Sequence, residues 1–412
     1  DILPKGFACP HCGKSAGFTK EEDTLDGWFD SGSTHFAAMK KDQGFWPATM
    51  YLEGLDQYRG WFQSSLLTAV GAFGEGAPFK ECVTHGWTVD GEGRAMHKSL
   101  GNGVDPADIF NENGADILRL WAASADYHAD VRCSKAIFQQ LSQNYLKFRN
   151  TCKFMLDNLV DFDPAHLTKA EDMPVLDRWL ITKLNELIEK VEQSYNDYEF
   201  HIITHAVNDF CVTTLSSFYL DIVKDRLYCE AADSAERRSA QTALYLTLST
   251  LAKLFAPILA FTCDEIWLAM PHTAEDDARN VVLNDMNKSF TAYALDAETM
   301  ARWEHIIEVR TAVNGALEEA RAAKVIGKSL EADVHLTVPE GDVFLADENP
   351  AALADLFIVS KVELTVGGEL AVKVENAAGT KCPRCWKHSL TPNAEGLCPR
   401  CAEVVRHLPD LL

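Results

Sequence analysis

The sequence predicts a multidomain protein in which an α/β part is followed by an all-α part, a small α/β module and a cysteine-rich tail. Three observations predict this order. Strand-like and helical runs alternate over residues 1–130, the apolar period is helical from 134 to about 270, and two CxxC pairs stand near the end of the chain. With 412 residues and 47% hydrophobic content, the chain can bury two or three cores.

Charge and cysteine content limit the class of protein. The formal net charge of -23 argues against broad, non-specific binding to nucleic acid, although a local basic surface could still bind RNA. Six of the 12 cysteines form CxxC pairs and the others are single, which indicates metal binding and buried thiols in a reducing compartment. No apolar run is long enough to span a bilayer, so we expect a cytoplasmic protein without a membrane partner. Because the chain starts at Asp1 instead of methionine, we expect a piece of a longer protein.

Basic side chains on the predicted helices are candidates for contacts with RNA phosphates, but scattered lysines and arginines are more typical of a solvated helix surface. These candidates are Arg178, Lys183, Lys190, Lys224, Arg226, Arg237 and Arg238. Charge alone therefore leaves the partner undecided.

Polar residues follow the first strand-like run of the α/β part. Residues 50–52 read as the end of a buried strand, and Glu53, Asp56 and Gln57 come directly after it. Ligands of doubly wound sheets bind just beyond the carboxyl ends of the strands, where these side chains could accept hydrogen bonds from hydroxyl and ammonium groups. A simple helix cap is the alternative, and it would need Asp56 alone. A second strand-like run contains His85, and a lone strand histidine is more typical of a structural role.

A glycine-rich loop with the sequence DGEGRAMHKSLGN spans residues 90–102. Glycine lets the backbone approach a ligand closely, and Lys98 and Ser99 are residue types that neutralise and bind phosphate groups. On the pattern alone, a solvated turn is the favoured interpretation, because many surface hairpins carry glycine, lysine and serine. The Asp105-Pro106 pair after it predicts the start of a helix.

The most specific local pattern is CPRC, twelve residues, and CPRC again near the end of the chain. Four thiolates form the closed tetrahedral shell that zinc favours, so the pattern predicts one structural zinc and no catalytic position. Disulfides are the alternative, which a reducing compartment disfavours. The predicted ligands are Cys382, Cys385, Cys398 and Cys401.

Two further features accompany the cysteines. Arg384 and Arg400 are expected to offset part of the charge of a zinc–thiolate centre, and together with Lys387 to present a basic tip to RNA. Cys9 and Cys12 form a single CxxC pair, which could be completed as a zinc knuckle by cysteines outside the chain or could be an unmetallated turn. Those two interpretations of the early pair remain open.

Several motifs occur in the order found in one enzyme family: YLEGLDQYRGWF at 51–62, VTHG at 83–86 and LGN at 100–102. The chain resembles the C-terminal half of the bacterial isoleucyl-tRNA synthetases, which are class I enzymes. Residues 95–99 stand where the family has Lys-Met-Ser-Lys-Ser; Ala95 replaces the first lysine and His97 the first serine, while Lys98 keeps the second lysine.

The resemblance implies four regions. Residues 1–130 would be the C-terminal part of a Rossmann-type catalytic domain carrying the AMHKS loop, and residues 131–290 a helical anticodon-binding domain. Residues 291–375 would form a small α/β junction module and residues 376–412 a zinc-ribbon tail. Other parts of the family's active site, a His-x-Gly-His motif and an editing domain, would lie upstream.

The implied activity is condensation of L-isoleucine with ATP and Mg²⁺ to isoleucyl-adenylate, followed by transfer to tRNA(Ile), by a monomer. Residues 1–412 alone are expected to be inactive. In the family, the positions of Lys98, Ser99 and His85 bind ATP, and Lys98 is catalytic. The positions that bind the adenylate and the amino acid are Glu53, Asp56, Gln57, Trp28 and Trp61.

Two alternatives to this activity remain at this stage. One is a valyl-tRNA synthetase, against which the EGLDQ motif and the terminal ribbon argue. The other is a non-catalytic paralogue that binds tRNA or zinc, which Ala95 and His97 keep open.

Overall fold

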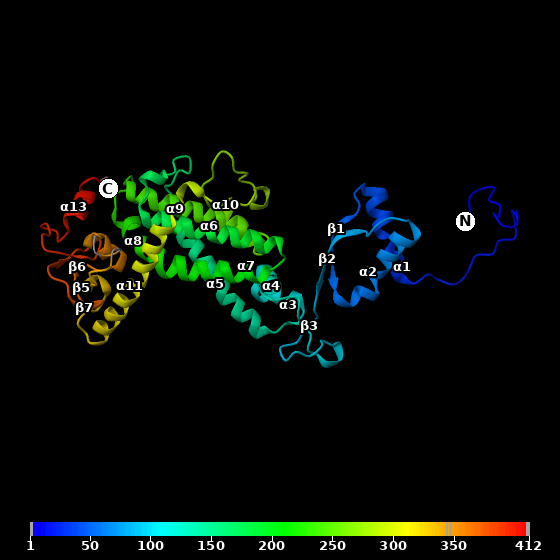
Figure 1. The fold of residues 1–412 in the computed structure, drawn as a ribbon, viewed down its shortest axis with the longest axis horizontal. Helices are drawn as coiled ribbons and strands as arrows, with labels where there is room; N and C mark the ends of the chain where they lie inside the picture. Colours follow the sequence, from blue (N-terminus) through cyan, green and yellow to red (C-terminus); the bar gives the residue numbers. More distant parts are fainter. Residues whose placement is uncertain (1–2, 343–344, 346–347, 409–412) are drawn as a thin grey trace. The chain divides into compact units, whose positions relative to one another are not determined.

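The computed structural model describes residues 3–342, 345 and 348–408. The chain forms two compact units (Figure 1). The first comprises Asp1–Asn102 and Tyr127–Arg132, and the second Gly103–Asp126 and Cys133–Leu412. The segment with α3 (Pro106–Asn113) and α4 (Ala115–Ser124) therefore packs with the helices that follow it.

The first unit is an α/β structure built around two parallel strands. Strand β1 pairs with β2 from Ala48↔Phe79 to Gly54↔His85, and β3 pairs in parallel with β4. A 3₁₀ turn and helix α2 connect β1 to β2, as the strand–helix–strand pattern predicts. The elements are α1 (Gly27–Thr34), β1 (Ala48–Gly54), α2 (Trp61–Leu67), β2 (Phe79–His85), β3 (Thr88–Val89) and β4 (Val131–Arg132).

One expectation for this unit is confirmed only in part. Residues 50–52 lie in a strand, as predicted, but the strand is not fully buried, because Tyr51 is buried whereas Leu52 is 56% exposed. Side chains alternate between the faces of a strand; Tyr51 packs against Phe62 of α2, and its neighbour Leu52 lies on the opposite face.

The second unit is mainly helical, as the apolar period predicts. Asp105 caps α3 by accepting from the Ala107 amide at 2.8 Å, which confirms the predicted helix start. Helix α9 lies inside the region of helical period, 134 to about 270, and packs against α5, α6, α8 and α10. The helices are α3 (Pro106–Asn113), α4 (Ala115–Ser124), α5 (Lys135–Asp157), α6 (Val175–Asn196), α7 (Phe200–Asp209), α8 (Leu220–Cys229), α9 (Ala235–Phe255), α10 (Ala260–Ala269) and α11 (Ala297–Ala322).

A small three-stranded sheet shares the core of these helices. Central strand β5 (Ala332–Val338) pairs in parallel with β6 (Lys361–Val366) and antiparallel with β7 (Ala371–Asn376). Every second residue of β5 is buried, and Val334 and Leu336 belong to the same apolar cluster as the helices. Helix α12 (Pro350–Phe357) contacts this sheet and α8.

The cysteine tail, residues 376–412, is described as far as residue 408. It contains the short strands β8 (Thr380–Lys381) and β9 (His388–Ser389), followed by α13 (Pro399–Arg406). Across the described parts of the chain, no helix has the length and apolar character needed to cross a membrane.

Candidate functional site

The carboxyl ends of β1 and β2 bring predicted pocket residues together. Gly54 pairs with His85, and a Cβ atom added at Gly54 would lie 2.7 Å from Asp56 Oδ1 and 3.6 Å from His85 Cε1. Gln57 Nε2 donates to Asp56 Oδ2 at 3.2 Å, and Glu53 lies exposed immediately before Gly54. Carboxylates, an amide and an imidazole therefore share the edge where such sheets bind ligands.

The two predicted pocket tryptophans lie around the same turn. Gln57 Oε1 accepts from the Trp61 amide at 3.0 Å, and a Cβ atom at Gly60 would lie 3.4 Å from Trp28 Cζ2. Trp61 stacks on Tyr51 with 4.2 Å between ring centroids, so part of its surface belongs to the core. Trp28 is 46% exposed and is the more accessible of the two tryptophans.

The AMHKS loop is organised by a buried carboxylate that the sequence pattern did not single out. Asp90 accepts from the amides of Glu92 (3.0 Å) and Arg94 (2.9 Å). It also accepts from Arg94 Nε and Asn102 Nδ2, both at 2.9 Å. The hydrogen bond from Asn102, followed by that from the Arg94 amide, holds the pKa of Asp90 well below its usual range, so this group is an anion at neutral pH.

Asn102 closes the other side of the loop. Its Oδ1 accepts from the His97 amide at 2.9 Å, and its Nδ2 donates to the Ala95 carbonyl at 3.1 Å. The two residues that depart from the family pattern are thus held by their backbones, while their side chains are exposed. Lys98 and Ser99 begin a short 3₁₀ turn and are also exposed.

The four predicted cysteines converge. Their sulfur atoms all lie within 4.8 Å of one another, and Cys385 Sγ is 3.8 Å from Cys398 Sγ. A tetrahedron with metal–sulfur bonds of about 2.3 Å has sulfur–sulfur edges of about 3.8 Å, so the donor set fits a tetrathiolate metal site. The amide of Cys398 donates to Cys382 Sγ at 3.4 Å.

The environments of the thiols differ. Burial raises the pKa of Cys382, but backbone N–H donors outweigh it and lower this pKa to about 6. Burial raises the pKa of Cys385. Among the described residues, these four cysteines are the side chains that lie close enough together to hold a metal ion. Cys9 and Cys12 lie in a turn, in which Gly13 N donates to Cys9 O at 2.8 Å, and a metal there stays a prediction.

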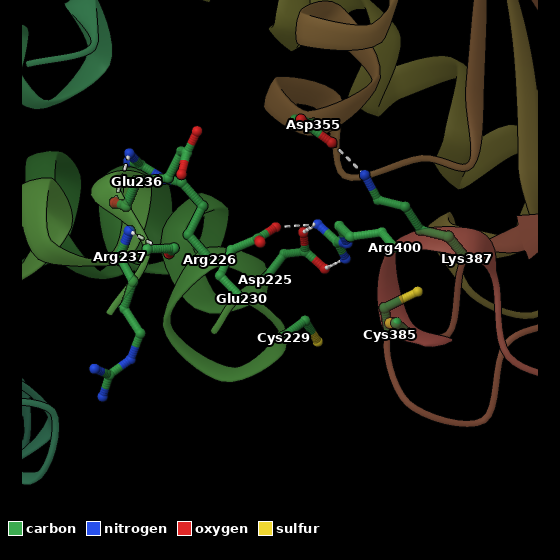
Figure 2. A network of polar contacts seen from close by, with 12 residues as sticks. Asp225, Arg226, Cys229, Glu230, Glu236, Arg237, Asp355, Cys385, Lys387 and Arg400 are labelled. Atoms are coloured by element: carbon green, nitrogen blue, oxygen red, sulfur yellow. Dashed lines mark hydrogen bonds and ion pairs between the residues drawn. The ribbon is translucent and has the colours of Figure 1, made fainter. Parts of the chain in front are cut away.

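The expected basic tip is wrong, because its cations bind acceptors within the chain. Arg400 pairs with Asp225, and Lys387 pairs with Asp355 (Figure 2). Arg384 donates to the backbone carbonyl of Tyr228 at 3.3 Å. These acceptors come from segments far from the tail in the sequence, so spacing alone could not reveal them.

Most candidate phosphate contacts on the helices are also engaged internally. Arg178 Nη2 donates to the Ala294 carbonyl at 2.8 Å, and Arg226 pairs with the buried Asp177. Arg237 pairs with Asp161. The interpretation of these arginines as free surface cations is therefore also wrong; they join elements of the helical unit.

Two family models match the chain. Residues 9–134 match tRNA synthetases class I (I, L, M and V), and residues 177–336 match the anticodon-binding domain of tRNA ligase. Together with the parallel strands, the loop and the helical unit, these matches define a class I aminoacyl-tRNA synthetase.

Similarity along the whole chain identifies the branch of that class. The chain is 47% identical over 434 residues to the isoleucine–tRNA ligase of Moorella thermoacetica, covering 99% of this chain and 46% of that protein. It is 48% identical over 429 residues to the isoleucine–tRNA ligase of Desulforamulus reducens, covering 98% and 46%. The chain belongs to the isoleucine–tRNA ligase family, and it spans somewhat under half the length of these curated relatives.

A solved structure shares the fold. The Agrobacterium radiobacter K84 agnB2 LeuRS, in a ternary complex with tRNA and LeuAMS, superposes with a TM-score of 0.55. The sequence identity is 16%, and the match covers 90% of this chain and 38% of that chain. At this identity the likeness concerns the fold alone.

Proposed function

We propose that this chain forms the C-terminal part of an isoleucine–tRNA ligase. The whole enzyme would condense L-isoleucine with ATP and Mg²⁺, release pyrophosphate and transfer the isoleucyl group to tRNA(Ile) in the cytoplasm. The observation that carries this proposal is the 47% identity to the Moorella thermoacetica isoleucine–tRNA ligase over 99% of this chain. The same similarity argues against the valyl alternative.

In this proposal, the strand-end cluster binds the aminoacyl-adenylate. Asp56 and Gln57 are held together at 3.2 Å and can accept hydrogen bonds from hydroxyl and ammonium groups. Glu53 adds an exposed carboxylate, and Trp28 and Trp61 wall the amino-acid side chain. No side chain needs to act as a nucleophile, because the carboxylate of isoleucine attacks ATP and the enzyme contributes positioning.

The loop supplies charge stabilisation to the leaving pyrophosphate. Arg94 is already paired with Asp90, whereas Lys98 is exposed beside Ser99. We assign to Lys98 the neutralisation of charge that develops on the phosphates, with Ser99 and His85 as further ATP contacts. Asp90 and Asn102 support this role by holding the backbone that precedes Lys98 and by bonding to each other across the loop.

The tetrathiolate site would hold one zinc with a structural role. Four sulfur ligands complete the tetrahedral shell, so the ion would supply folding energy to the tail and would leave no position for a reacting water. Cys382, Cys385, Cys398 and Cys401 would be its ligands.

The test uses the full-length protein that contains this chain. We expect isoleucine-dependent ATP–pyrophosphate exchange and charging of tRNA(Ile), with valine a weaker substrate for activation by roughly 10- to 200-fold. Residues 1–412 alone should show no exchange, because they contain only part of the active site. Preference for valine would favour the valyl alternative, and absence of both reactions would favour the non-catalytic one that Ala95 and His97 allow.

A further inference from the structure

The cysteine tail is attached to the end of α8 by an arginine that two carboxylates share. Arg400 Nη1 and Nη2 donate to the two oxygens of Asp225 at 2.5 and 2.8 Å, and Nη1 also donates to Glu230 Oε1 at 2.9 Å. Figure 2 shows this arginine pointing from the tail toward both acids. All three side chains are at most 34% exposed, so water screens this contact less than an exposed ion pair.

A second arginine joins the same helix end to the thiol cluster. Helix α8 ends at Cys229, and its last carbonyls have no donor within the helix. Arg384 donates to the carbonyls of Tyr228 (3.3 Å) and Cys229, and its Nη1 lies 3.7 Å from Cys401 Sγ. The guanidinium therefore separates the partly negative end of a helix from a sulfur that would be anionic with metal bound.

Apolar packing completes this contact. The buried Cys229 belongs to one cluster with Cys382, Cys385, Leu397 and Cys401. Its Sγ also lies 3.8 Å from the Arg384 carbonyl. The thiol cluster thus packs directly on the end of α8, beside the contacts made by Arg384 and Arg400.

We propose that Asp225, with Glu230, is a positioning residue that holds the metal-bearing tail on α8, and that the tail serves tRNA charging only in this docked position. The proposal rests on the proposed function, because it takes tRNA as the substrate. It assigns Arg400 to docking rather than to RNA, since an RNA phosphate would have to displace two carboxylates from the guanidinium. Metal binding folds the tail, and the Asp225–Arg400 contact places it.

The structure offers a matched control on the same helix. Asp221 lies one turn before Asp225, is 44% exposed and pairs with Lys224 of α8 itself, so its removal leaves both carboxylates that bind Arg400 in place. The variants are Asp225→Asn, Asp221→Asn and the exchanged pair Asp225→Arg with Arg400→Asp, all in the full-length enzyme.

We expect Asp225→Asn to keep its zinc, measured by metal analysis, and its ATP–pyrophosphate exchange. Cleavage of the tail by a low concentration of protease should be about tenfold faster, and the KM for tRNA should rise about tenfold, because a bidentate charge-assisted contact is lost. Asp221→Asn should match the wild type in every measurement. The exchanged pair should recover at least part of the protection.

Equal protease sensitivity of Asp225→Asn and Asp221→Asn would overturn the proposal. Loss of zinc from Asp225→Asn would also overturn it, since Asp225 would then be needed to fold the tail rather than to dock it. The protease measurement needs no tRNA. Failure of the wild type to charge tRNA would therefore reject the proposed function while leaving the docking test valid.

Discussion

The AMHKS loop and the cysteine tail both carry cations beside a candidate functional motif, but the fold engages these cations differently. In the loop, Asp90 and Asn102 organise the backbone, and Lys98 stays exposed. In the tail, Arg400 and Lys387 are bound by acids of α8 and α12. A cation near a functional motif is therefore available to a ligand only if the fold brings no carboxylate or carbonyl oxygen to it.

The largest expected effect concerns the available cation. Lys98→Ala in the full-length enzyme should slow ATP–pyrophosphate exchange by about 100- to 1000-fold, because one positive charge is lost from the developing pyrophosphate. The KM for isoleucine should change little. The exposed Lys80 of β2 provides the control, since Lys80→Ala also removes one surface charge. An exchange rate within twofold of the wild type would reject the catalytic role of Lys98.

A change in the tail should impair tRNA charging rather than ATP–pyrophosphate exchange. Cys398→Ser removes one of four ligands, so zinc content should fall, the tail should become sensitive to protease, and tRNA charging should drop by about tenfold or more. ATP–pyrophosphate exchange should persist. Cys82→Ser, at an exposed thiol outside the cluster, is the control. Protein purified under reducing conditions without bound zinc would contradict the metal assignment.

The scaffold of the loop can be tested without touching Lys98. Asp90→Ala removes an acceptor of four hydrogen bonds, and the displaced loop should slow exchange by about 10- to 100-fold. Glu92 accepts only a peripheral contact from Arg94 and is 74% exposed, so Glu92→Gln should be nearly neutral. Similar rates for the two variants would show that the buried carboxylate does not position Lys98.

The smallest effect is on stability in acid. Hydrogen bonds from Arg237 lower the pKa of Asp161 to about 2, so this pair stabilises the fold above the unfolded pKa of about 3.9. That stabilisation is lost as the pH falls from about 5 toward 2. Asp161 is 43% exposed, so the contribution should be at most about 1 kcal/mol. Tm measured against pH should fall less steeply in acid for Asp161→Asn than for the exposed control Asp157→Asn.

The sequence predicted the parts whose information is local. The helical period from 134 to about 270 placed helices α5 to α10 of the second unit, the Asp105-Pro106 pair placed the start of α3, and CxxC spacing placed the thiol cluster. Patterns of this kind depend on residues a few positions apart, which share one helix face or one turn.

The remaining features depend on contacts between distant segments. Arg400 and Asp225 are 175 positions apart, and Arg384 reaches a carbonyl 156 positions away. Spacing carries no information on such pairs, so the arginines could not be separated in advance from RNA contacts. The burial of Asp90 was missed for a related reason, because its partner Asn102 lies across the loop.

We propose that the loop serves adenylate formation while the tail serves transfer to tRNA. The most direct measurement is the ratio of ATP–pyrophosphate exchange to tRNA charging in full-length Lys98→Ala and Cys398→Ser. We expect Lys98→Ala to lose exchange, and charging with it, whereas Cys398→Ser should keep exchange and lose charging. An equal loss of both reactions in Cys398→Ser would contradict the division of labour.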